Sequence, residues 1–154
     1  MAKRSAGLLM YRRGAHGLEL FLAHPGGPFW AKKDDGAWTI PKGLIDDGED
    51  ALAAARREFA EETGGSAVGE ATALGDYKQP GGKVIVAFAL EGDCDPTRLR
   101  SNSFTLEWPP RSGRMREFPE IDRAAWFAPE EAMRKILKGQ QPIIAALLRH
   151  LAGR

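Results

Sequence analysis

Cysteine is almost absent from this sequence, since Cys94 is the only one among 154 residues. One thiol cannot form an intramolecular disulfide, and it cannot build a cysteine-rich zinc site. Long apolar runs are missing too, because the stretch from Ala6 to Tyr11 is too short for a signal segment or a membrane span. Together these absences predict a cytoplasmic protein with no membrane attachment.

An excess of charge of either sign is also lacking. The chain has 22 basic and 21 acidic residues, for a formal net charge of +1. This balance gives no overall attraction to nucleic acid or to a membrane surface, so any electrostatic attraction of a ligand must be local. A composition that is 43% hydrophobic and 28% charged is typical of a globular protein, and we expect residues 1–154 to form a single domain.

The apolar pattern predicts strands before and after one central helix. The helix is expected from about Glu49 to Thr63, where the sequence is rich in alanine and ends at Gly64, a residue suited to the left-handed cap. Two further helices are expected at 129–137 and 142–151. Strands are expected at 8–11, 18–23, 37–40, 71–78, 83–90, 104–108 and 124–127, with loops at 25–36, 93–102 and 109–119. This order predicts an α/β fold whose mixed sheet is covered by helices on both faces.

Three glutamates share one face of the central helix. At 100° per residue, Glu58, Glu61 and Glu62 fall with Arg57 within an arc of roughly 140°, and the apolar residues cluster on the opposite side. Acids at this spacing repel one another by a few tenths of a kcal/mol per pair in an isolated helix, so a bound cation would offset a real cost. Magnesium suits the site because it takes oxygen ligands and keeps positions open for phosphates, and manganese is the expected substitute.

Three glutamates at this spacing, taken alone, would favour a solvated acidic surface over a metal site. Their neighbours reverse that preference, because fixed residues extend on both sides of them. From Gly43 the sequence runs Gly-x5-Glu49-x7-Arg57-Glu58-Phe59-x-Glu61-Glu62-x-Gly64. This pattern resembles the signature box of the Nudix hydrolase family at every fixed position. One departure is Gly65, where the family usually has an aliphatic residue, and we expect it to loosen packing at the helix exit.

The resemblance implies a Nudix α/β/α sandwich with a mixed sheet and a catalytic loop–helix–loop. It implies that the Gly43 carbonyl, Glu58 and Glu62 bind the metal, with Glu61 either a further ligand or a contact to a metal-bound water. Arg57 would orient the glutamates, and Glu49 would hold the loop to the helix. The implied reaction is a magnesium-dependent hydrolysis by substitution at phosphorus.

The general base is expected outside the box. Nudix enzymes often take a further acid from a loop shortly before an aromatic residue on a late strand, and Glu120 precedes Trp126 in this way. Glu117 and Glu107 are competing candidates. A surface position for Glu120 remains equally open, because sequence spacing does not show placement.

Candidate substrate-binding residues lie on both sides of the box. The segment 38–43 resembles the entry to the box in dinucleoside polyphosphate hydrolases and RNA pyrophosphohydrolases, so Lys42 could reach a phosphate, with a solvated lysine as the alternative. Arg111, Arg114 and Arg116 form a basic cluster that would suit a polyphosphate lying between them and the helix. Four aromatic residues could stack on a base, although core packing is the better expectation for any single one: Trp30, Trp38, Tyr77 and Trp108.

The substrate class stays open between two groups. The segment 104–113 resembles a bacterial Nudix subgroup described as nucleoside triphosphate pyrophosphohydrolases. Dinucleoside polyphosphate hydrolases often carry a tyrosine some 16 to 18 residues beyond the box, but Gly81, Gly82 and Lys83 occupy those places here. Pro80 fits a rule for ADP-ribose pyrophosphatases, or simply a turn. We expect nucleoside triphosphates or dinucleoside polyphosphates first and ADP-ribose-type sugar nucleotides second.

Two classes other than a small-molecule hydrolase remain. A catalytically silent nucleotide-binding module is opposed by the intact Glu58, Glu61 and Glu62. A nucleic-acid binder is disfavoured by the near-neutral charge and the acidic helix, although a 5′ RNA end could still be a substrate. The expected partner is therefore a small-molecule nucleotide, without a membrane. The sequence does not indicate an oligomeric state.

Overall fold

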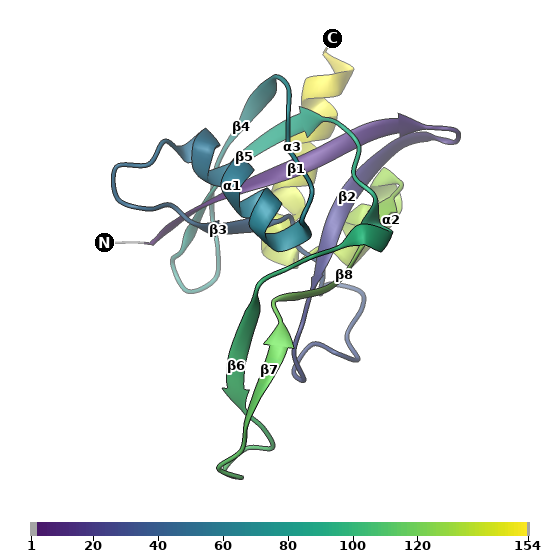
Figure 1. The fold of residues 1–154 in the computed structure, drawn as a ribbon. Helices are drawn as coiled ribbons and strands as arrows, with labels where there is room; N and C mark the ends of the chain where they lie inside the picture. Colours follow the sequence, from purple (N-terminus) through teal and green to yellow (C-terminus); the bar gives the residue numbers. More distant parts are fainter. Residues whose placement is uncertain (1–2, 154) are drawn as a thin grey trace.

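A computed structural model describes residues 3–153 of the chain (Figure 1). The eight strands in this described part are β1 (Arg4–Gly14), β2 (Gly17–Pro25), β3 (Lys42–Leu44), β4 (Ala71–Lys78), β5 (Val84–Glu91), β6 (Ser103–Glu107), β7 (Met115–Pro119) and β8 (Ile121–Phe127). The α-helices are α1 (Ala51–Thr63), α2 (Pro129–Lys135) and α3 (Gln141–Ala152), and two short 3-10 turns cover Pro96–Arg98 and Lys138–Gln140. No helix in residues 3–153 is long and apolar enough to cross a membrane.

The main sheet is mixed, as the sequence predicts. Its strand order is β4-β5-β1-β2-β8, with β3 paired to β1 beside that path. Strands β1 and β5 run parallel, with Leu8 opposite Phe88, and the other pairs are antiparallel. Strand β1 is long enough to pair with β3 through its first residues and with β2 through its last. This shared use of β1 brings the start of the Nudix-like box onto the sheet.

Helices cover both faces of this sheet, and alternation along β1 explains why. Leu8 and Met10 pack in the cluster that includes Phe59 of α1, whereas Leu9 packs in the cluster that includes Ile143 of α3. Successive strand side chains point to opposite faces, so a continuous apolar run in β1 fills both cores. The expected α/β/α sandwich is therefore confirmed.

Two predictions about local structure are wrong. Residues 37–40 form no strand: they make only isolated bridges, Thr39 to Ala23 and Trp38 to Ile136. The predicted loop 109–119 contains β7, which pairs with β6 in a separate two-stranded sheet that extends away from the main body (Figure 1). Phe118 is the only residue of β7 that is not exposed, so the sequence shows no alternation of buried and exposed side chains that would predict a strand. The strand is recognised only by its pairing with β6.

Helix α1 begins two residues later than expected. Asp50 is its N-cap and accepts a hydrogen bond from the Ala53 N–H at 3.1 Å. Gly64 ends it with φ of 77°, and the Gly64 N–H donates to the Ala60 carbonyl. Both ends are therefore fixed by local chemistry, and the buried side chains of Ala55 and Phe59 set the face that α1 turns toward the sheet.

Removing the apolar anchor of α1 should destabilise the protein strongly. Phe59 is fully buried, with its ring centroid 5.8 Å from that of Phe21. We expect Phe59→Ala to lower the free energy of unfolding by about 3–5 kcal/mol, because it leaves a cavity under the helix. Urea unfolding measures the change. The control Val68→Ala, at a side chain that is 76% exposed, should change stability by less than about 0.5 kcal/mol; an equal effect of both would contradict this packing.

Candidate active site

Strand β3 and helix α1 meet at Gly43. The pairing of Gly43 with Ala6 of β1 fixes the backbone there. A side chain at this position is excluded, because a Cβ on Gly43 would overlap the carboxyl group of Glu58. The Gly43 backbone and the Glu58 carboxylate therefore lie against each other, as a shared metal site would require.

Arg57 is the centre of the hydrogen bonds in this region. Its Nε and Nη2 both donate to the Glu49 carboxylate, each at 2.9 Å. Its Nη1 donates to Glu58 Oε1 at 2.8 Å and to Glu61 Oε2 at 3.2 Å, and its Nη2 also donates to the Leu44 carbonyl. Hydrogen bonds from Arg57 lower the pKa of Glu49 to about 2. One guanidinium thus connects the loop before α1 with two glutamates of the helix.

Glu58 and Glu62 are partly removed from solvent and repel each other. Burial raises the pKa of Glu62 to about 8; the Lys42 charge opposes this rise, and the charges of Glu58 and Glu120 add to it. Burial also raises the pKa of Glu58, against the opposing effect of Arg57 and with the charges of Glu61 and Glu120 added. Both pKa values are raised because the two carboxylates are partly buried and because the nearby positive charges do not fully offset the neighbouring negative ones.

The negative charge of Glu120 adds to the raised pKa of Glu58 and of Glu62, although burial is the main cause of both shifts. The Glu120 backbone is fixed on two sides: its carbonyl accepts from the Gly26 N–H and its N–H donates to the Asn102 carbonyl, each at 2.8 Å. The competing acids are placed differently. Glu107 accepts from the backbone N–H groups of the turn at Arg111 and Gly113, and Glu117 lies on β7; like Glu120, both are exposed.

These residues suit a divalent cation, although the acids do not converge as ligands. Within residues 3–153, no three acidic, histidine or cysteine side chains group around a single point. Glu58 and Glu61 turn toward Arg57, and Glu62 accepts weakly from the Lys42 N–H at 3.4 Å. The donors are oxygen atoms only, two of the carboxylates have raised pKa values, and glycine leaves backbone room beside one of them. This donor set is the kind that magnesium prefers.

The structure does not bring every expected substrate residue to the glutamates. Trp38 is 4% exposed, packs edge-on to Phe127 at 4.9 Å and donates from Nε1 to Asp34, so its ring belongs to the core and offers no face to a base. Tyr77 packs half-buried against the same core and donates its hydroxyl to the Leu74 carbonyl. Arg111 and Arg114 lie at the tip of the β6–β7 hairpin, at the end of the molecule away from α1 (Figure 1).

Lys42 does lie at the site, and it also lines a cavity that the sequence analysis did not anticipate. This cavity, of about 680 Å³, includes Trp30, Lys83 and Lys138 in its lining. Trp30 was among the four aromatic residues that could stack on a base, whereas Lys83, beside two turn glycines, had no distinguishing signal in the sequence.

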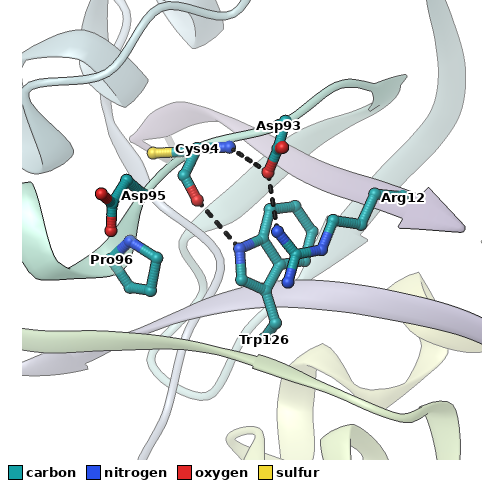
Figure 2. Close-up of a pocket in the computed structure, with 6 residues that line it drawn as sticks. All are labelled: Arg12, Asp93, Cys94, Asp95, Pro96 and Trp126. Atoms are coloured by element: carbon teal, nitrogen blue, oxygen red, sulfur yellow. Dashed lines mark hydrogen bonds and ion pairs between the residues drawn. The ribbon is translucent and has the colours of Figure 1, made fainter. Parts of the chain in front are cut away.

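A second cavity, of about 590 Å³, lies beside Trp126 (Figure 2). The Arg12 guanidinium covers the Trp126 ring at 4.1 Å and donates to Asp93 at 2.7 Å, and Trp126 Nε1 donates to the Cys94 carbonyl. Burial raises the pKa of the Cys94 thiol, which disfavours the nucleophilic thiolate. The polar groups of this cavity thus bind one another, and it adds nothing to the chemistry at Glu58.

Comparison with known proteins identifies the family. The model described as the NUDIX domain matches residues 1–148. The chain belongs to the Nudix family. This membership makes it a Nudix pyrophosphohydrolase. No curated protein matches the Nudix chain by sequence.

Solved structures share its fold at low sequence identity. An Ap4A hydrolase of Caenorhabditis elegans, solved as a binary complex, superposes with a TM-score of 0.67 at 23% identity, covering 97% of this chain and 99% of the other. The NUDIX domain of Shewanella oneidensis NrtR, in complex with ADP ribose, gives 0.68 at 14% identity, covering 98% and 89%. A MutT/Nudix family protein of Listeria innocua gives 0.63 at 17% identity, covering 98% and 94%.

The raised pKa of Glu62 should appear in the pH dependence of stability. Its pKa is 4.5 in a model compound and about 8 in the folded protein, so between these values only the folded state holds the proton. This group's contribution to stability is therefore fully present at low pH and is lost as pH rises through about 8. We expect metal-free Glu62→Gln to show a shallower fall in urea midpoint from pH 5 to 8.5 than the wild type. Glu130→Gln on α2 should keep the wild-type slope, and an unchanged slope in Glu62→Gln would refute the shift.

Proposed function

We propose that this Nudix protein is a magnesium-dependent hydrolase that cleaves a phosphoanhydride bond in nucleoside triphosphates or dinucleoside polyphosphates, with manganese able to replace magnesium. The observation that carries the proposal is the contact between the Gly43 backbone and the carboxylate of Glu58, on a helix that also carries Glu61 and Glu62. This acidic group adjoins, through Lys42, a cavity large enough for a nucleotide. We expect the enzyme to act in the cytoplasm on small molecules, and on RNA only at a 5′ end.

Each residue then has a distinct task. A bound divalent ion supplies positive charge that stabilises the phosphate oxygens during the reaction. Glu58, Glu62, the Gly43 carbonyl and Glu61 would hold this ion, and Arg57, which donates to Glu58 and Glu61, would keep them oriented. Glu120 accepts a proton from the attacking water as the new oxygen–phosphorus bond forms. The bond to the bridging oxygen breaks, and this oxygen leaves with the departing phosphate group.

A second candidate function is the hydrolysis of ADP-ribose-type sugar nucleotides. It is supported by the similarity to the NrtR domain, which was solved with ADP ribose. The similarity to the nematode Ap4A hydrolase supports the first candidate in the same way. A nucleotide-binding module without catalysis is the remaining alternative, and the complete set of helix glutamates opposes it.

One incubation panel separates these functions. Purified protein would be mixed with magnesium, or separately with manganese, and with Ap4A, ATP, GTP or ADP-ribose, and the products identified by chromatography. Turnover of Ap4A or of the triphosphates, with negligible turnover of ADP-ribose, is the expected result. Preference for ADP-ribose would replace the first candidate with the second, and no turnover of any compound would leave the binding module.

Loss of the proposed base should slow the reaction without weakening the substrate complex. We expect Glu120→Gln to lower kcat by about a hundredfold or more with little change in KM, because the amide cannot take the proton. Steady-state kinetics on the best substrate of the panel measures this. Glu117→Gln, three residues away on β7, is the matched control and should keep kcat within about twofold. A normal kcat in Glu120→Gln would exclude the residue as the base.

A further inference from the structure

The cavity beside Lys42 is enclosed by segments that are distant in the sequence. Its walls come from the loop after β2, the turn between β4 and β5 and the connection between α2 and α3. Ser5 of β1 and Ile85 of β5 contribute from the sheet. Lys42 belongs both to this lining and to the surroundings of Glu62. Lys42, whose N–H lies 3.4 Å from the Glu62 carboxylate, therefore places this cavity next to the candidate active site.

Its charge is opposite to that of the glutamate group. Three lysines line it, Lys42, Lys83 and Lys138, and no aspartate or glutamate of the described chain does. Most of the remaining surface is apolar, from Trp30, Pro80, Ile85 and Leu137. A ligand that matches this lining has an apolar, flat portion and several negative charges, which are the properties of a nucleoside joined to phosphates.

The walls are held in place before any ligand binds. Gln79 of the β4–β5 turn donates from Nε2 to the Gly139 carbonyl at 2.9 Å. A Cβ on Gly139 would press against the Gln79 side chain, so glycine permits this close contact. Gln140 is buried, and its amide accepts from the Ile40 N–H and bonds the Thr39 hydroxyl. A cavity built in this way loses little entropy when it binds its ligand.

We propose that this lysine cavity, defined by Lys42, Lys83, Lys138 and Trp30, binds the nucleoside and the phosphates beyond the cleaved bond, and that it selects substrates with more than two phosphates. This inference rests on the proposed function. A diphosphate such as ADP-ribose has both phosphates at the glutamate site, with no further phosphate to place beside Lys83 and Lys138. In a longer chain, each further phosphate brings negative charge to these ammonium groups.

The test compares substrates of different phosphate number in lysine variants. We expect Lys83→Met with Lys138→Met to lower kcat/KM for dinucleoside tetraphosphate by about thirtyfold or more, mainly through KM, since each lost charge-assisted contact costs about tenfold or more. The same pair should change kcat/KM for ADP-ribose by less than about threefold. Lys78→Met, exposed on β4 outside the lining, controls for the loss of a positive charge. An equal loss on both substrates, or no loss on the tetraphosphate, would overturn the proposal.

A binding measurement tests the same cavity without turnover. A methylene-bridged, non-hydrolysable tetraphosphate analogue should quench tryptophan fluorescence, and Trp30→Phe should remove most of this change, whereas Trp108→Phe should retain it. The lysine pair should raise the Kd of the analogue at least tenfold. If the wild type hydrolyses nothing but binds the analogue in this lysine-dependent way, the proposed function fails and the cavity assignment stands. If it hydrolyses the tetraphosphate but Trp30→Phe retains the quenching, the cavity assignment fails alone.

Discussion

The contacts of Arg57 hold together the acidic region on which the candidate site depends. Five glutamates contribute negative charge to this region, Glu49 in the loop before α1, Glu58, Glu61 and Glu62 on the helix, and Glu120, and their repulsion must be offset for the fold to be stable. Arg57 offsets part of it by binding Glu49 with two donors and Glu58 and Glu61 with a third. Glu62 makes no such contact with Arg57, and burial and its acidic neighbours raise its pKa accordingly. Arg57 thus orders the site but neutralises only part of its negative charge. The charge that remains would favour a bound cation.

Local chemistry explains which features could be predicted from the sequence. Helix α1 was predictable because its acidic face, its apolar face and the Gly64 cap lie within one short segment. Strand β1 was predictable in part, because its apolar run is continuous, although it extends beyond the predicted residues at both ends. Strand β7 was not predictable from the sequence, because its residues show no alternation of apolar and polar side chains. Its extended conformation is evident only from its pairing with β6. Trp38 resembled a ligand-stacking residue only because sequence carries no measure of burial.

The same distinction applies to the site. The box residues form a pattern within one segment, and Glu120 was predicted as the base from its place before Trp126, a role that stays a prediction. The lysine cavity could not be found in this way, because Lys42, Lys83 and Lys138 converge only through the crossover of the sheet and the packing of the α2–α3 connection. Arg111 and Arg114 show the opposite case. They are close in sequence and have a suitable charge, but they lie at the tip of the β6–β7 hairpin, at the end of the molecule away from α1 (Figure 1). Sequence proximity predicts chemistry only where one element holds all the residues.

The β6–β7 hairpin has a structural consequence at Glu120 that its exposed tip does not suggest. Two-stranded sheets are marginal alone, and this one is supported by the loop after β2, where Phe29 packs edge-on to Trp108 and Gly27 approaches Phe104. At the base of the hairpin, a Cβ on Gly26 would overlap the Pro119 carbonyl, so glycine allows the loop to approach. The hydrogen bonds from Gly26 and to Asn102 then fix the Glu120 backbone between hairpin and body. Because the same loop carries Trp30 to the lysine cavity, one segment places parts of both the acidic and the cationic halves of the site.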